Sequence, residues 1–144
     1  MSLILDMNTN EIVAYDLALR PNLEQVSRML DKAFKKFTNL SGLIFHSDQG
    51  WQYQHKYFRK TLEKYGIIQS MSRKGNCYDN SVMETFYGRL KTEIYYDFEG
   101  EYSSFNAFAA AIEEYINYYN NKRIRKKTKW MLPVKYREAS MCLG

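Results

Sequence analysis

Short apolar segments typical of buried β-strands alternate with longer amphipathic segments through most of this chain of 144 residues. Two short segments come first, on either side of an Asn-Thr-Asn cluster at residues 8–10, and they predict a β-hairpin. Further along, apolar residues recur at three- and four-residue steps, which is the periodicity of a helix with one buried face. A hairpin followed by strands that alternate with helices predicts an α/β architecture in which helices flank short strands.

The periodicity and the turn-forming residues between segments define the expected elements. Strands are expected at residues 3–7, 11–18, 43–45 and 67–71. Helices are expected at residues 21–37, 53–65, 81–96 and 103–120, and Gly66 is placed to end the second of them. We therefore expect one folded domain over residues 1–121, followed by a basic C-terminal arm over residues 122–144.

Composition excludes several classes of protein. Hydrophobic residues make up 45% and charged residues 26% of the chain, as in ordinary globular proteins, which excludes disordered, collagen-like and coiled-coil chains. No apolar run approaches the roughly 18 residues of a membrane span, and no signal peptide opens the chain. Cys77 and Cys142 form neither a disulfide framework nor a zinc ligand set, so the expected location is the cytoplasm.

Basic residues are concentrated near the C-terminus. Lys and Arg total 21 against 16 Asp and Glu. Residues 122–137 contain no acidic residue and eight basic ones: Lys122, Arg123, Arg125, Lys126, Lys127, Lys129, Lys135 and Arg137. The charge suits contact with a polyanion, and an ordinary solvated tail is an equally good interpretation. The preceding Tyr115, Tyr118 and Tyr119 slightly favour the polyanion, because tyrosine rings stack on bases.

Two carboxylates occupy positions where metal chemistry is possible. Asp48 directly follows a predicted strand, at the carboxyl end where ligand crevices form in α/β sheets. Glu84 lies in the first turns of a later helix, and 35 residues separate the two. If they converge, they could share a divalent cation such as Mg²⁺. Two such ions can activate a water or a 3′-hydroxyl and stabilise the leaving oxygen of a phosphodiester.

Each carboxylate also has a purely structural interpretation. Residues 48–50 could form a simple turn, with Asp48 as its hydrogen-bonding first residue. Ser81 and Glu84 fit a capping box, in which the glutamate only satisfies a backbone N–H group. A helix that starts one residue earlier would free Glu84. Position alone slightly favours the structural interpretation in both cases.

Basic residues near these carboxylates could bind phosphate. Lys91 follows Glu84 by close to two helical turns, so the two side chains share a face about 10 Å apart. Arg73 and Lys74 lie just before Gly75 and could add phosphate contacts. For Lys91 an ordinary surface lysine is the commoner explanation, and Arg73 and Lys74 could equally belong to a solvated loop.

Two histidines near Asp48 raise the question of a zinc site. His46 and His55 are accompanied by no third histidine, cysteine pair or HExxH helix, so the sequence does not support one. A histidine on an apolar strand, as His46 is, is more typical of a structural role.

Three motifs together resemble a known family. They are HSDQGWQY at residues 46–53, SRKGNCYDNSVMETF at residues 72–86, and YINYYNNKR at residues 115–123 followed by PVKYR at residues 133–137. This set resembles the integrase core of bacterial insertion-sequence transposases, the group nearest to retroviral integrases. The resemblance covers essentially the whole chain.

The resemblance implies an RNase H-like fold, a mixed sheet flanked by helices, with a D,D-35-E site that binds two Mg²⁺ or Mn²⁺ ions. Such sites cut DNA at transposon ends and join the 3′-hydroxyl to target DNA. Asp48 matches the second acidic residue of this site, Glu84 the third, and Lys91 a basic residue that contacts DNA near the cut. The implied partners are DNA and further copies of the chain, in a bacterial cytoplasm and on the nucleoid. The residues expected to bind DNA phosphates without reading sequence are Lys91, Arg73, Lys74, Lys122, Arg123, Arg125, Lys126 and Lys127.

The first acidic residue of the family site has no match in this sequence. In the family it lies on a central strand that precedes the hairpin, whereas Asp6 lies in what looks like the second strand. We therefore assign no catalytic role to Asp6. We expect weak metal affinity, little strand-transfer activity, and open strand edges satisfied by a partner chain or by a rearranged hairpin.

Two other functional classes stay open. A non-catalytic DNA-binding or dimerising module would bind DNA with salt-dependent affinity and never cut it. A different RNase H-like nuclease would act on RNA–DNA hybrids, and the short interval from Asp48 to Glu84 together with Lys91 makes that class less favourable.

Overall fold

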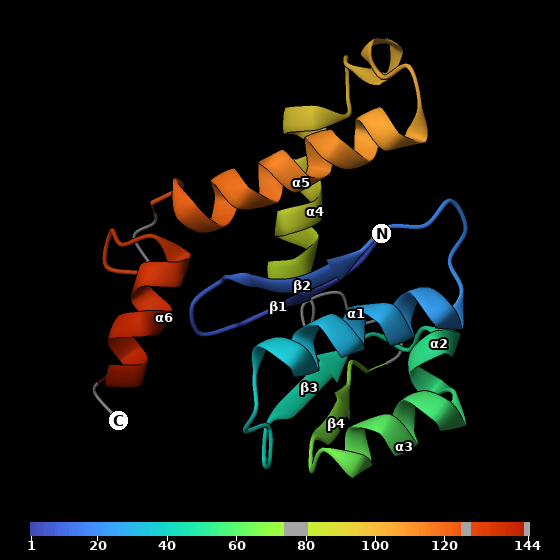
Figure 1. Cartoon of the computed structure of the whole chain (residues 1–144), viewed down its shortest axis with the longest axis vertical. Helices are drawn as coiled ribbons and strands as arrows, with labels where there is room; N and C mark the ends of the chain where they lie inside the picture. The colour runs from blue at the N-terminus through green and yellow to red at the C-terminus, as the bar shows by residue number, and fades with distance from the viewer. Residues whose placement is uncertain (74–80, 125–127, 143–144) are drawn as a thin grey trace. The chain divides into compact units, whose positions relative to one another are not determined.

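The computed structural model describes residues 1–73, 81–124 and 128–142 (Figure 1). Its elements in chain order are β1 (Ser2–Leu5), β2 (Ile12–Asp16), α1 (Leu23–Lys36), β3 (Ile44–Ser47), α2 (Trp51–Gln54), α3 (Lys56–Lys64), β4 (Ile68–Met71), α4 (Ser81–Ile94), the 3₁₀ helix η2 (Glu99–Glu101), α5 (Phe105–Asn121) and α6 (Pro133–Cys142). The predicted hairpin and the alternation of strands with helices are confirmed.

The predicted helix at residues 53–65 is wrong in one respect, because it is two helices. His55 has extended backbone angles, with φ −65° and ψ 139°, and it separates α2 from α3. Its side chain accepts a hydrogen bond from the Tyr57 backbone N–H at 3.2 Å, which makes His55 the N-cap of α3. The second histidine near Asp48 therefore has a structural role.

The four strands form two separate two-stranded sheets (Figure 1). One is the hairpin of β1 and β2, and the other pairs β3 with β4 in parallel. Ile44 lies opposite Ile68, and Ser47 lies opposite Met71. Among the described residues no strand joins the two sheets.

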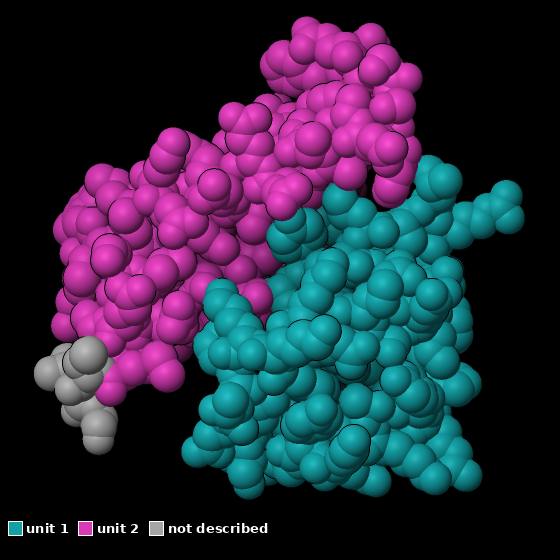
Figure 2. Space-filling view, viewed as in Figure 1, with its two compact units in different colours: residues 1–2, 14–84 teal, residues 3–13, 85–144 magenta. Residues whose placement is uncertain are grey.

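The chain divides into two compact units, coloured separately in Figure 2. Unit 1 comprises residues 1–2 and 14–84, and unit 2 comprises residues 3–13 and 85–144. The core of unit 1 is formed by apolar side chains of α1 and α3, of which Val26, Met29, Leu30, Phe58 and Leu62 are almost completely buried.

Helix α1 in unit 1 has the sequence features that favour helix formation. The Asn22 side chain accepts a hydrogen bond from the Gln25 backbone N–H at 2.8 Å and caps the N-terminus. Glu24 lies in the first turn, and Lys35 and Lys36 lie in the last, which complements the helix dipole. These local signals explain why the predicted bounds and the observed bounds of α1 nearly agree.

The core of unit 2 is formed by α4 and α5. Phe86 and Leu90 of α4 and Ile112, Ile116 and Tyr119 of α5 are buried. The Phe86 and Tyr119 rings meet edge to face, with centroids 4.9 Å apart. This is the apolar face predicted for each of the two helices.

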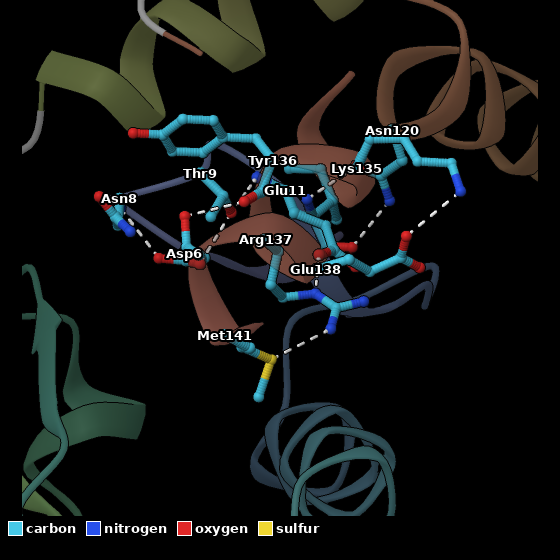
Figure 3. A network of polar contacts seen from close by, with 12 residues as sticks. Asp6, Asn8, Thr9, Glu11, Asn120, Lys135, Tyr136, Arg137, Glu138 and Met141 are labelled. Carbon is cyan, nitrogen blue, oxygen red and sulfur yellow. Dashed lines mark hydrogen bonds and ion pairs between the residues drawn. The ribbon is translucent and has the colours of Figure 1, made fainter. Parts of the chain in front are cut away.

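Buried polar contacts attach the hairpin end of unit 2 to its C-terminal segment (Figure 3). Ile12 donates its backbone N–H to Asn120 Oδ1 and accepts from Asn120 Nδ2, both at 2.9 Å. The fully buried Glu11 carboxylate accepts a hydrogen bond from Arg137 of α6. Sequence analysis expected no helix within residues 122–144, yet residues 133–142 form one that contacts the hairpin.

A search of the described residues finds no helix long and apolar enough to cross a membrane.

Candidate functional site

Asp48 lies at the carboxyl ends of two parallel strands in unit 1. It directly follows β3, while Ser72 and Arg73 directly follow β4. Because parallel strands point the same way, these residues lie at one edge of the sheet. The Asp48 and Arg73 side chains are exposed. This is the position that the sequence predicted for Asp48.

The predicted turn at residues 48–50 is confirmed, and it does not exclude a ligand role. Asp48 Oδ1 accepts a hydrogen bond from the Gly50 backbone N–H at 2.8 Å. The Asp48 carbonyl accepts one from Ser47 Oγ at 3.0 Å. In the part of the chain that the structure describes, no hydrogen bond reaches Asp48 Oδ2. One carboxylate oxygen therefore holds the turn while the other is available to a cation.

The Asp48 carboxylate and the Gln52 side chain approach Gly50 closely. A Cβ atom on Gly50 would lie 2.9 Å from Asp48 Oδ1, 2.9 Å from Gln52 Oε1 and 3.3 Å from Tyr53 Cδ2. Distances this short force neighbouring atoms to move, so any side chain at residue 50 displaces the carboxylate. The sequence contained the signal, since Gly50 belongs to the first motif, but its steric reason appears only in the structure.

Tyr53 and His46 support the same edge of the sheet. Burial raises the pKa of Tyr53, and the negative charge of Asp48 raises it further, so the phenol stays neutral. His46 Nδ1 lies 3.0 Å from Ser70 Oγ, and its Nε2 lies 3.1 Å from Ser72 Oγ. The prediction that His46 is a structural histidine is confirmed.

Glu84 belongs to the same compact unit as Asp48 and has an exposed side chain. Helix α4 begins at Ser81, so Ser81 is a helical residue and does not occupy the cap position that the capping box requires. These bounds match the alternative in which the helix starts one residue earlier and Glu84 is not held by the cap.

Lys91 lies seven residues beyond Glu84 on α4, in the last turn of the helix, and its side chain is exposed. Phe86 and Leu90 form the buried face of α4. The helix itself thus provides an exposed carboxylate and an exposed ammonium group two turns apart, which is the arrangement that the sequence predicted.

Asp48 and Glu84 each carry the kind of donor that fits a hard divalent cation. Carboxylate oxygens are the side-chain ligands that Mg²⁺ and Mn²⁺ prefer, and Asp48 and Glu84 supply them. Within residues 1–73, 81–124 and 128–142, no group of three or more His, Cys, Asp or Glu side chains could hold a metal ion. The family site has three acidic residues, and the described residues do not assemble such a set.

The predicted phosphate-binding residues of the arm differ in how available they are to a phosphate. Lys122 is exposed. Arg123 is not freely available, because its Nη1 contacts the Glu93 carboxylate at 2.8 Å and the Tyr115 hydroxyl at 3.2 Å. Burial, followed by the Glu93 charge, raises the pKa of Tyr115 to about 12. The other predicted residues, Lys74, Arg125, Lys126 and Lys127, lie outside the described residues.

Sequence reasoning missed the residues that hold the Asp48 loop. The Gln49 side chain donates to the Ser72 carbonyl at 3.0 Å, and the Ser72 backbone N–H donates to the Ser47 carbonyl at 2.8 Å. Both Gln49 and Ser72 lie inside the recognised motifs, but their pairing across 23 positions is not visible in the sequence.

Comparison with known families gives two matches. Residues 1–77 match a family described as integrase core domain, and residues 84–141 match a second family with the same description. The first match alone covers more than half of the chain.

Similar proteins include several transposases. An uncharacterized transposase-like protein of Haemophilus influenzae is 49% identical over 141 residues, which cover 98% of this chain and 64% of that protein. A putative transposase of insertion sequence element IS150 from Escherichia coli is 45% identical over 137 residues, 95% of this chain and 48% of that protein. The transposase of element IS904 from Lactococcus lactis is 37% identical over 133 residues, 90% of this chain and 51% of that protein. The chain thus spans about half to two thirds of the length of these relatives.

Solved structures identify the fold. The catalytic core domain of BIV integrase has a TM-score of 0.68 at 18% identity, with 96% of this chain and 85% of that chain covered. A chain of the simian T-cell lymphotropic virus intasome, solved with a PP2A regulatory subunit, has a TM-score of 0.59 at 19% identity and covers 75% of this chain and 37% of that chain. The predicted RNase H-like α/β fold is confirmed, and the chain belongs to the integrase core domain family of insertion-sequence transposases.

Proposed function

We propose that this chain is the core of a transposase that positions DNA phosphates at a divalent metal site containing Asp48 and Glu84. The observation that carries the proposal is the position of the Asp48 carboxylate and the way its two oxygens are used. This carboxylate is exposed at the carboxyl ends of two parallel strands, with Oδ1 fixed by the Gly50 N–H and Oδ2 reached by no hydrogen bond in the described residues.

The residues have distinct roles in this proposal. Asp48 and Glu84 would hold Mg²⁺ or Mn²⁺, which would supply activation of a water or a 3′-hydroxyl and neutralise charge on the phosphodiester. Lys91, on the same helix as Glu84, binds a nearby phosphate, and Arg73 binds another at the end of β4. The remaining predicted contacts other than Arg123, which is paired with Glu93, add salt-dependent affinity without reading sequence: Lys74, Lys122, Arg125, Lys126 and Lys127. Self-association of the chain on DNA belongs to the same proposal.

Asp6 does not supply the first acidic residue of the site in this proposal. Its Oδ1 accepts from the Asn8 backbone N–H at 2.9 Å, and its Oδ2 accepts from Thr9 Oγ at 2.7 Å. Both oxygens are therefore used within the hairpin turn. We accordingly expect this chain to bind metal weakly and to have little strand-transfer activity.

The proposal is tested by measuring DNA binding with and without Mn²⁺ by fluorescence anisotropy, at two salt concentrations. Mn²⁺ should tighten binding to duplex DNA that carries a transposon end, and Asp48→Asn or Glu84→Gln should remove that metal-dependent part. Lys91→Ala should weaken binding at low salt, whereas Lys60→Ala, which changes an exposed lysine of α3, should not. If both carboxylate variants keep the full Mn²⁺ effect, the proposed site is wrong.

A second candidate is a non-catalytic DNA-binding module, which the use of Asp6 in a turn favours. Cleavage assays with Mn²⁺ distinguish the two functions, using this chain and a version extended upstream through a strand that contains an aspartate. Cutting by the extended version supports the transposase core. DNA binding without cutting by both versions supports the module.

A further inference from the structure

Ser72 connects the end of β4 to both sides of Asp48. Its backbone N–H donates to the carbonyl of Ser47, the residue before Asp48, at 2.8 Å. Its own carbonyl accepts from the side chain of Gln49, the residue after Asp48, at 3.0 Å. Ser72 is 5% exposed, so these bonds are shielded from water. Ser72, which directly follows β4, thus holds the backbone on both sides of Asp48.

The Ser72 hydroxyl adds a third attachment. Ser72 Oγ donates to the Ser47 carbonyl at 3.3 Å and lies 3.1 Å from His46 Nε2. Because a hydroxyl has only one proton, His46 Nε2 donates to Ser72 Oγ, while His46 Nδ1 lies 3.0 Å from Ser70 Oγ. The hydroxyl therefore joins the last two residues of β3 to the end of β4, immediately before the exposed carboxylate.

We propose that Ser72 is a positioning residue for the Asp48 carboxylate. Its hydroxyl fixes the end of β3, so that the turn from Asp48 to Gly50 keeps Oδ1 on the Gly50 N–H and holds Oδ2 toward solvent for a divalent cation. The inference rests on the proposed metal role of Asp48, but the geometry that it explains is already present in the metal-free chain.

The hydroxyl can be removed while the backbone bonds remain. Ser72→Ala deletes Oγ and keeps the N–H and carbonyl that bond Ser47 and Gln49, and Ser72→Thr retains a hydroxyl. Ser70→Ala is the matched control, because the Ser70 hydroxyl contacts the same histidine at its other nitrogen and, within the described residues, makes no bond to the Asp48 loop.

Two measurements test the proposal. In the metal-free chain, hydrogen exchange of the Gly50 amide followed by NMR should be at least about fivefold faster in Ser72→Ala, near the wild-type rate in Ser72→Thr, and unchanged in Ser70→Ala. The Mn²⁺ dissociation constant, measured by electron paramagnetic resonance, should rise by a similar factor in Ser72→Ala and recover in Ser72→Thr. Denaturant unfolding of each variant identifies any general loss of stability.

The outcomes separate the two proposals. Unchanged Gly50 exchange in Ser72→Ala, or equal acceleration in Ser70→Ala, would overturn the positioning role whatever the metal data show. Faster Gly50 exchange in Ser72→Ala, combined with an Mn²⁺ affinity that Asp48→Asn leaves at the wild-type value, would keep the positioning role and reject the metal site.

Discussion

Asp6 and Asp48 form the same local turn with opposite consequences. Each directly follows a strand, and each accepts the backbone N–H of the residue two positions later, at 2.9 Å for Asp6 and 2.8 Å for Asp48. The second oxygen of Asp6 accepts from the Thr9 hydroxyl at 2.7 Å, whereas the part of the chain described here places no such donor at the second oxygen of Asp48. A turn-forming aspartate is therefore structural or ligand-binding according to what its other oxygen meets.

Glu11 and Glu84 show the same contrast between a glutamate used within the fold and one left exposed. Glu11 is fully buried in the hairpin segment and pairs with Arg137, while Glu84 is exposed on α4. Acidic residues of the hairpin thus contribute to stability, and the acidic residues proposed for the site are left to a ligand. Substitutions can separate these two kinds of acidic residue.

The largest expected effect comes from removing the partner of the buried glutamate. Arg137→Met should lower the free energy of unfolding by about 3 kcal/mol, because it leaves Glu11 buried without its guanidinium. Denaturant unfolding measures the loss. Lys135→Met on the same helix removes an exposed pair with Glu138 and should cost less than about 1 kcal/mol. Equal losses for the two variants would contradict the distinction.

The second-largest expected effect comes from removing the Asn120 side-chain amide, which is hydrogen-bonded to the hairpin backbone. Asn120→Ala should lower the free energy of unfolding by about 2 kcal/mol, because the Ile12 N–H and carbonyl lose their partners in a buried place. Asn121→Ala is the control, since among the described residues the Asn121 side chain bonds only to Asn117 on its own helix. Equal losses in the free energy of unfolding for Asn120→Ala and Asn121→Ala would mean that the Asn120 bonds to Ile12 do not stabilise the fold.

Substitution of Asp48 and substitution of Asp6 should have different effects on Mn²⁺ affinity. Asp48→Asn should weaken Mn²⁺ binding by at least about tenfold, or roughly 1.4 kcal/mol, because it removes the charge of the ligand oxygen. Asp6→Asn should leave Mn²⁺ binding within about twofold, since both Asp6 oxygens are already used. Titration followed by electron paramagnetic resonance gives both constants. If Asp6→Asn weakens Mn²⁺ binding as much as Asp48→Asn does, Asp6 is a metal ligand.

The smallest effect is on stability at the two turns. Asp6→Ala should cost about 1 kcal/mol, because two hydrogen bonds of the hairpin turn are lost. Asp48→Ala should change the free energy of unfolding by no more than about 0.5 kcal/mol, since its single side-chain bond is exposed to water. A larger loss for Asp48→Ala would mean that this turn is needed for folding.

The sequence predicted those features that depend on local periodicity and on motifs. Asp48 at a strand end, the buried face of α4 and the extent of α1 all follow from residues close together in the chain. The break at His55 depends on one side-chain bond to Tyr57, which hydrophobic periodicity does not record. The sequence does not predict helix α6, because its basic residues belong to the run interpreted as a C-terminal arm and the bond from Arg137 to Glu11 spans 126 positions.

Pairing across the sheet was equally inaccessible to sequence reasoning. The contacts of Ser72 with Ser47 and Gln49 depend on the parallel register of β3 and β4, and the pairing of Arg123 with Glu93 joins positions 30 residues apart. The motifs named the right segments, but only the register shows which residues of those segments contact one another.

The Asn120 side chain has a consequence for the behaviour of the hairpin in concentrated solution. A side-chain amide has the same donor and acceptor as a peptide group, and at Ile12 it takes the place that another strand would occupy. Exposed strand edges recruit foreign strands and begin aggregation. By occupying this edge at one residue, α5 keeps the Ile12 N–H and carbonyl from pairing with a foreign strand.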